Sequence, residues 1–154
     1  GSRYVSSSER QITQDGLDNF SAKLVPSQSI ILSCRAPIGH VAINQTPMSF
    51  NQGCKGLVPN KELMVEYLFY FLVISKKLLN DLGTGTTFKE ISGKKLSSVK
   101  MLLPPLAEQQ HIVAKLDAAF AEIENANNAI IKSKANYLAL KSAILAQELQ
   151  SEVA

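Results

Sequence analysis

The 154-residue chain has only two cysteines and no long apolar run, and each shortage excludes a class of protein. Cys34 and Cys54 are too few for a disulfide framework and do not lie at a metal-ligand spacing such as Cys-x-x-Cys. The most apolar stretch, residues 63–74, contains Glu66 and falls short of the roughly 20 residues that cross a bilayer. The sequence therefore predicts a cytoplasmic protein with reduced thiols, no bound metal and no membrane span.

Catalytic motifs are missing as well. Residues 83–95 hold glycines and hydroxyls, but Phe88 and Lys95 break the pattern of a nucleotide-binding P-loop. Neither a glycine-rich dinucleotide fingerprint nor the Asn/Asp-Pro-Pro-aromatic motif of an amino-methyltransferase occurs. A pairing of His40 with either cysteine stays open, although no local pattern supports it. The sequence thus predicts a non-catalytic chain without a cofactor.

Glycine and proline are absent after Pro105, whereas all eight glycines and all six prolines lie in the first 105 residues. Because both residue types interrupt helices, we expect a turn-rich domain over residues 1–105 and one long helix over residues 106–154. The proline pair suits the start of a helix, where a missing N–H has no partner to lose. Glu108 then falls in the first turn, where the helix dipole favours a carboxylate.

Short runs of β-branched and aliphatic residues predict a sheet in the first domain. Residues 29–34 and 40–44 flank a turn, residues 35–39, that contains proline and glycine, so a β-hairpin is expected. Residues 56–59 would pair with it as a third strand. Residues 99–103 would close the domain as a final strand.

One helix is expected over residues 61–82, capped by Asn60 and ended by Gly83. Residues 4–11 are polar after their first two positions and predict a loop or the start of a short helix. The expected fold class is α+β: a small mixed α/β globular domain followed by one long C-terminal coiled-coil helix.

The long helix repeats its apolar residues every seven positions, the period of a coiled-coil seam. At 1.5 Å per residue, a helix over residues 106–151 would be roughly 70 Å long, so we expect it to project and to pair with another helix. A helix folded back on its own domain is the alternative. The interface residues expected from the repeat are Leu116, Ala119, Ile123, Ala126, Ile130, Tyr137, Leu140 and Ile144.

The two parts differ in charge. Residues 1–105 hold 12 Lys and Arg against 7 Asp and Glu, a balance of +5, and residues 106–154 hold 4 against 6, a balance of −2. A basic domain favours binding to a polyanion, and a mildly acidic helix with an apolar seam favours binding to protein. An excess of this size is also common in ordinary soluble domains, so charge alone does not decide the function.

Four segments resemble one protein family. Residues 103–110, Leu-Pro-Pro-Leu-Ala-Glu-Gln-Gln, and the following residues 112–117 resemble the junction between a target recognition domain and a conserved helix in specificity subunits of type I restriction-modification systems. Residues 33–39, 51–53 and 83–92 are similar to further segments of that family, in the same order. The junction is the specific motif, and the other three would be weak alone.

The resemblance implies a role in DNA recognition. A subunit of that family carries two recognition domains, each reading half of a split site in double-stranded DNA, and two helices that pack antiparallel as a spacer. Adenine methylation with S-adenosylmethionine and ATP-driven cleavage belong to separate methyltransferase and restriction subunits. This chain has one helix and one domain that starts part-way, so we expect a truncated piece or a half-size variant that forms a homodimer through the helix.

Basic, hydroxyl and amide side chains of residues 1–105 are the candidate DNA contacts. Those expected at phosphates are Arg10, Lys23, Arg35, Lys55, Thr86, Thr87, Lys89, Lys94 and Lys95. Those able to read base edges through paired hydrogen bonds are Gln11, Arg35, Asn51 and Gln52. Each lysine is equally well explained as a solvated surface charge, and residues 51–53 as a structural turn.

A second function class stays open, namely a protein-interaction module whose coiled coil oligomerises without binding DNA. The two classes differ in their response to salt, because DNA binding weakens steeply as salt rises.

Overall fold

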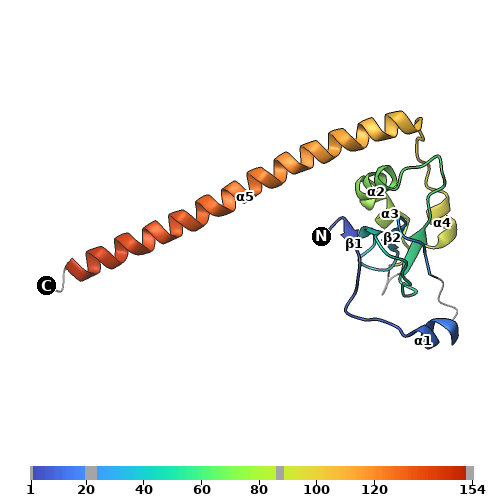
Figure 1. The fold of residues 1–154 in the computed structure, drawn as a ribbon, viewed down its shortest axis with the longest axis horizontal. Helices are drawn as coiled ribbons and strands as arrows, with labels where there is room; N and C mark the ends of the chain where they lie inside the picture. Colours follow the sequence, from blue (N-terminus) through green and yellow to red (C-terminus); the bar gives the residue numbers. More distant parts are fainter. Residues whose placement is uncertain (1, 20–23, 86–88, 152–154) are drawn as a thin grey trace. The chain divides into compact units, whose positions relative to one another are not determined.

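The computed structural model describes residues 2–19, 24–85 and 89–151 (Figure 1). The chain divides into two compact units, residues 1–113 (unit 1) and residues 114–154 (unit 2). Each unit is a structure in its own right. No helix of the described residues is both long enough and apolar enough to pass through a lipid bilayer.

Unit 1 is built on a four-stranded sheet of β1 (Tyr4–Val5), β2 (Ile30–Ser33), β3 (Val41–Asn44) and β4 (Cys54–Leu57), in the order β1-β3-β2-β4. The antiparallel pairing of β2 with β3 confirms the predicted hairpin. A third strand pairs with β2 as predicted, but it covers Cys54–Leu57 and so begins two residues before the predicted range 56–59. Gly39 closes the hairpin turn with a φ of 89°, a value that glycine adopts without strain. Strand β2 lies between β3 and β4 and forms main-chain pairs with both of them.

Strand β1 is parallel to β3 and was not predicted. The main chain at its two ends makes the pairing, because the Ile43 N–H donates to the carbonyl of Arg3 and the Gln45 N–H donates to that of Val5. A strand of two residues is too short to show an alternating pattern, so the sequence could not reveal it.

The helices of unit 1 differ from the predicted single helix over residues 61–82. The structure has α2 (Val65–Ile74) and α3 (Lys76–Leu82), separated at Ser75, besides the short α1 (Gln14–Asn19) and α4 (Gly93–Ser97). Asn60 caps only a local turn, in which its Oδ1 accepts from the Glu62 N–H, so the start predicted at residue 61 is wrong. The ψ of Ser75 is 1°, which breaks the helical repeat, whereas the end predicted at Gly83 is confirmed.

The strand predicted over residues 99–103 is also wrong, because this segment pairs with no strand of the described residues. It lies instead against α2, where the Tyr67 hydroxyl donates to the carbonyl of Leu102 at 3.1 Å. Val99 and Met101 pack on the core while Leu102 is 87% exposed. The alternation in the sequence therefore reflects a segment with one face against a helix, and it produced a false strand.

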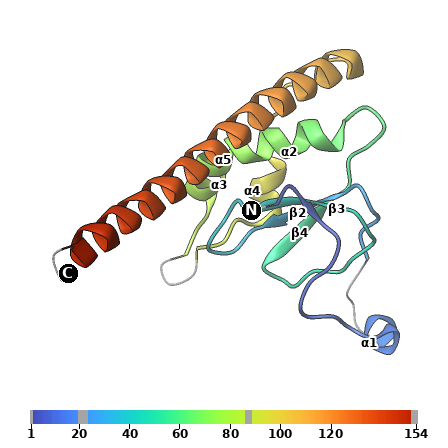
Figure 2. The ribbon, with the colours of Figure 1, turned by 60° about the vertical axis from the view of Figure 1, so that its left-hand side comes forward.

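Helix α2 covers one face of the sheet, as Figure 2 shows, and α3 packs beside it against the turn between β2 and β3, where Asn80 Nδ2 donates to the carbonyl of Ile38 at 3.0 Å. The core lies between the sheet and these two helices. The buried side chains come from both layers, which confirms the expected α+β fold class of a small domain followed by a long helix. The fully buried aliphatic residues are Ile30, Leu32, Ile38, Ile43, Leu79 and Ile91.

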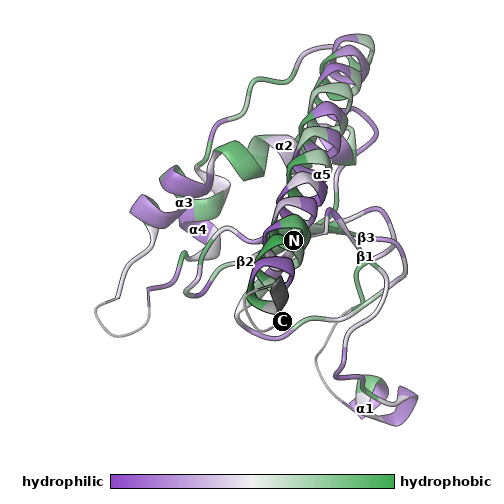
Figure 3. Ribbon diagram, turned by 90° about the vertical axis from the view of Figure 1, so that its left-hand side faces the viewer, coloured by the Kyte–Doolittle hydropathy of each residue, from purple (hydrophilic) through white to green (hydrophobic). Residues whose placement is uncertain are grey.

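Helix α5 (Leu106–Ser151) has 46 residues and begins at the predicted residue, and residues 152–154 of the predicted range lie outside the described residues. Its first turns belong to unit 1, where Gln109 is 0% and Val113 6% exposed. Beyond them, apolar and polar residues alternate along the helix (Figure 3), and the seam residues Ile123, Ile130 and Tyr137 are 55%, 64% and 65% exposed. These side chains of the predicted helix interface are therefore exposed along the helix itself.

Candidate nucleic-acid interface

Four basic residues of unit 1 lie in the outer strand β4 or in segments next to β4 and to the end of β2, and we call Arg35, Lys55, Lys89 and Lys94 the basic edge. Lys55 lies in β4, and its Cε is 4.0 Å from the position that a Cβ would take on Gly93, next to Lys94. Lys89 is joined to the turn after β2, because its carbonyl accepts from the Ala36 N–H at 2.9 Å. Three distant parts of the sequence thus meet around the end of β2 and the start of β4.

Arg35 is held from several sides. Its main-chain N–H donates to the carbonyl of Gly53 at 3.1 Å, and its side chain donates from Nε and Nη2 to Oε2 of Glu90 at 3.1 and 2.9 Å. The two side chains remain 43% and 37% exposed. The guanidinium is therefore accessible and fixed in orientation.

Two predicted DNA contacts have structural hydrogen bonds. The Lys95 Nζ donates to the carbonyl of Leu82 at 2.9 Å and so pairs one of the last carbonyls of α3. The Asn51 Oδ1 accepts from the Gly53 N–H at 3.0 Å, as expected for a residue that shapes its own turn. Gln52, which lies between Asn51 and Gly53 in this turn, is exposed.

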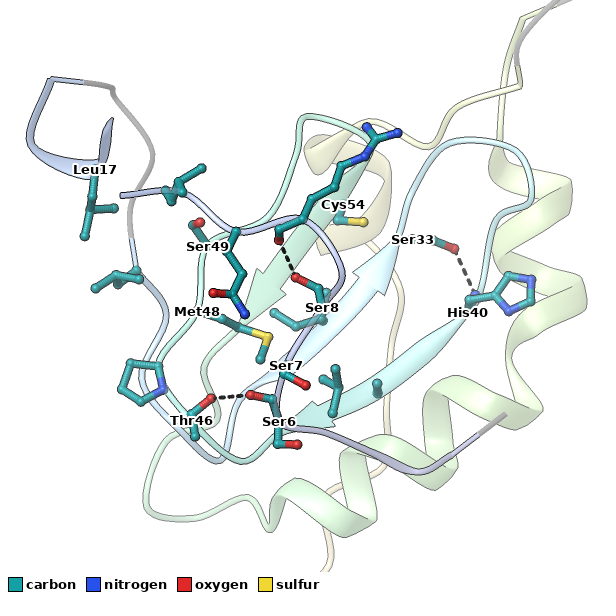
Figure 4. A pocket seen from close by; sticks show the side chains of 18 of the residues that line it. Ser6, Ser7, Ser8, Leu17, Ser33, His40, Thr46, Met48, Ser49 and Cys54 are labelled. Carbon is teal, nitrogen blue, oxygen red and sulfur yellow. Dashed lines mark hydrogen bonds between the residues drawn. The ribbon is translucent and has the colours of Figure 1, made fainter. Parts of the chain in front are cut away.

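Arg10 and Gln11 lie on a different part of unit 1, along a hollow of about 660 Å³. As Figure 4 shows, the hollow separates the arm of residues 5–14 from the sheet face opposite α2, and the Thr46 hydroxyl ties the arm down by donating to the carbonyl of Ser6 at 3.0 Å. The predicted contacts thus fall into two groups. Lys23, Thr86 and Thr87 lie outside the described residues.

The sequence left open a catalytic pairing of His40 with Cys34 or Cys54, but neither cysteine has an activated thiol. Burial raises the pKa of Cys34, to which Cys54 and Glu90 add while Lys55 opposes the shift, and burial also raises the pKa of Cys54. Both thiols are free, and a raised pKa keeps them protonated, whereas the thiolate is the nucleophile. In the described parts of the chain, no three His, Cys, Asp or Glu side chains are grouped so that they could hold a metal ion.

Three polar residues that organise unit 1 were not recognised in the sequence. Glu90 binds Arg35, 55 positions away. Asn44 is fully buried, accepts from the Ser29 N–H at 2.7 Å and donates to the carbonyls of Pro26 and Thr46. The sequence signal for Glu90 and Asn44 is weak, because no neighbouring residue in the sequence marks their distant partners.

Gln109, the third of these residues, joins the start of α5 to the body of unit 1. Its Oε1 accepts from the Met64 N–H at 2.9 Å, and its Nε2 donates to the carbonyls of Glu62 and Pro104, both at 2.8 Å. All three partners lie in the loop before α2 or in the proline pair that precedes α5. The motif of residues 103–110 therefore works as a junction whose buried amide is fully paired.

The sequence matches a known protein family over most of its length. Residues 2–133 match the family described as type I restriction modification DNA specificity domain. The chain belongs to this family. A specificity subunit of the type I restriction enzyme MjaIX from Methanocaldococcus jannaschii is 36% identical over 124 residues, which are 79% of this chain and 29% of that protein. The EcoR124I/EcoR124II specificity subunit of Escherichia coli is 33% identical over 123 residues, 76% of this chain and 30% of that protein.

Solved structures of the family have the same fold. A structure on complex assembly and conformational transition of the type I R-M system matches 80% of this chain and 30% of its own, with a TM-score of 0.70 at 30% identity. The HsdS subunit of Thermoanaerobacter tengcongensis matches 70% of this chain and 25% of its own, with a TM-score of 0.61 at 28% identity. The chain therefore spans less than a third of the length of these relatives.

Proposed function

We propose that this chain binds double-stranded DNA as a recognition part of a type I restriction-modification enzyme. Unit 1 takes one half of a split target, and α5 provides the spacer. The chain is not catalytic and needs no cofactor, because methyltransferase subunits, and through them restriction subunits, assemble with it in the cytoplasm and perform the chemistry.

The observation that supports DNA binding most directly is the basic edge. Among the described residues, no hydrogen bond or ion pair engages the ammonium groups of Lys55, Lys89 and Lys94. Unpaired ammonium groups on the surface of a domain neutralise phosphates and release counterions, which gives DNA affinity without sequence preference. Arg10, Gln11 and Gln52 are the further exposed residues proposed to contact DNA.

The exposed seam of α5 supports a homodimer. Ile130, Leu140 and Ile144 are 64%, 61% and 50% exposed, and a row of such residues at a seven-residue repeat is buried when two helices pair. A two-fold dimer would present two identical recognition domains and would favour a palindromic split site.

A salt titration tests the DNA-binding proposal. The affinity of the chain for a fluorescent duplex, measured by anisotropy, should fall steeply as salt rises. Lys55→Gln, Lys89→Gln and Lys94→Gln together should lower the logarithmic salt slope by about 2 to 3, at about 0.9 for each phosphate that the protein no longer neutralises. Three exposed lysines of the same unit outside the basic edge, changed in the same way, form the matched control: Lys61, Lys76 and Lys100.

Two outcomes would overturn the proposal: no binding by the unchanged protein at low salt, or an equal reduction of the slope in both triple variants. The second candidate function, a protein-interaction module, rests on the exposed seam alone. It would be favoured if the chain dimerised through α5 and did not bind duplex DNA.

A further inference from the structure

Arg35 differs from the three lysines of the basic edge because it is already paired. Its Nε and Nη2 both donate to a single oxygen, Oε2 of Glu90, at 3.1 and 2.9 Å. This contact uses the side of the planar guanidinium that carries Nε. In the described parts of the chain, nothing else accepts a hydrogen bond from the Arg35 side chain.

The end of the guanidinium therefore remains available. A guanidinium has five N–H donors in one plane, so an N–H of Nη1 and the outer N–H of Nη2 point away from the end of the side chain, next to each other. Two adjacent parallel donors match the O6 and N7 acceptors of guanine in the major groove. The side-on contact with Glu90 thus leaves free the pair of donors that reads guanine.

The negative charge of Glu90 makes Arg35 better suited to contact a base than a phosphate. A phosphate placed at Arg35 would also lie near the carboxylate, which offsets the attraction of the guanidinium. A base edge carries no net charge and does not meet this opposition to the same extent. Arg35 therefore suits a base, whereas Lys55, Lys89 and Lys94 suit phosphates.

The main chain around the pair is held as firmly as the side chains. The main-chain N–H groups of Arg35, Ala36 and Ile91 donate to the carbonyls of Gly53, Lys89 and Cys34, respectively, the last at 2.9 Å. Arg35 and Glu90 also face each other in a β-bridge. A long side chain that is ordered before binding loses less conformational entropy when it binds.

We propose that Arg35 reads a guanine of the target DNA and that Glu90 is the positioning residue that holds it in place. The proposal rests on the proposed DNA-binding function and adds to it a base preference and a residue that acts through another. It assigns to an acidic residue a favourable role in binding an acidic polymer.

Selection from DNA with a randomised segment tests this assignment on the full chain. Duplexes with a randomised central segment are bound to the protein, recovered and sequenced, for the unchanged chain and for Glu90→Ala, Glu90→Gln and Arg35→Lys. Glu90→Ala removes the partner of Arg35, whereas Glu90→Gln removes the same charge but keeps an oxygen that accepts from Arg35. Asp81→Asn, which removes a carboxylate that is paired with Lys77 and lies within electrostatic reach of Lys89 but does not bind Arg35, is the charge control.

The unchanged chain should enrich one motif with a guanine at a fixed position. Glu90→Ala and Arg35→Lys should lower the preference for that guanine by roughly tenfold or more, and Glu90→Gln should lower it less. On a duplex without the motif, Glu90→Ala should instead bind at least as tightly as the unchanged chain, because one negative charge has been removed. A merely electrostatic role of Glu90 cannot produce these opposite signs.

The outcomes separate this inference from the function on which it rests. No binding to any duplex by the unchanged chain would overturn the DNA-binding function itself. Binding without an enriched guanine, or an enriched guanine that Glu90→Ala leaves intact, would overturn only the roles given to Arg35 and Glu90. Equal reductions in Glu90→Ala and Asp81→Asn would also reject the positioning role. Because both side chains are partly exposed, circular dichroism should show folded variants.

Discussion

Replacing Gln109 by methionine should destabilise unit 1. Methionine keeps the length of the side chain but removes three hydrogen bonds: the one that Gln109 accepts from the Met64 N–H and the two that it donates to the carbonyls of Glu62 and Pro104. A net hydrogen bond contributes about 1 kcal/mol, and a buried group left without its partner costs about 1–3 kcal/mol. Since water reaches part of these main-chain groups, we expect a decrease of about 3 kcal/mol in the free energy of unfolding.

Urea and thermal unfolding at one protein concentration measure this decrease. A change of this size is a large part of the roughly 5–15 kcal/mol that stabilises a typical domain and should lower the Tm by about 10 °C. Gln110→Met is the matched control, because Gln110 is the exposed next residue of the same helical turn and should change stability by less than about 0.5 kcal/mol. Equal stabilities of the two variants would refute the reasoning that the buried amide holds the junction together.

Two further predictions concern the seam and the thiols. Ile130→Lys should convert a dimer into a monomer in light scattering, because it places a charge in the seam. Asn128→Lys, two positions away on the other side of the helix, should leave the mass unchanged. A dimer in both variants would place the interface elsewhere. Burial raises the folded pKa of Cys34 and Cys54, so iodoacetamide should react slowly with the folded chain at neutral pH and quickly in urea. The unfolded chain loses these protons first as the pH rises past about 8.5, so the contribution of the thiols to the free energy of unfolding should be constant below that pH and fall above it, less so in Cys34→Ala. Rapid alkylation of the folded protein would contradict this account.

The parts of the fold that follow from local physics were predictable. A proline pair, a carboxylate in the next turn and 49 residues without glycine or proline defined the start of α5, and the hairpin of β2 and β3 followed from two β-branched runs around Pro37 and Gly39. Each of these signals acts within a few residues, so tertiary structure cannot easily override it.

The parts that depend on distant partners were not predictable. Residues 99–103 show an alternation that a strand would show, but their contacts are with α2. In the candidate interface the residue types were foreseen, while the sequence could not tell that Lys95 and Asn51 bond to the main chain or that Arg35 meets Glu90. Such hydrogen bonds form only after the chain has folded, and their geometry separates an available cation from an engaged one.

Strand β4 lies at the edge of the sheet, and this position gives Lys55 a second physical consequence. An unpaired edge offers main-chain N–H and C=O groups to the edge of another molecule, and a charged side chain on a short edge strand opposes such aggregation. Neutralising Lys55 would therefore weaken the protection against self-association at the same time as any contact with a polyanion. Reversal to glutamate keeps a charge on the edge, so comparing the solubility of Lys55→Gln and Lys55→Glu separates the two effects.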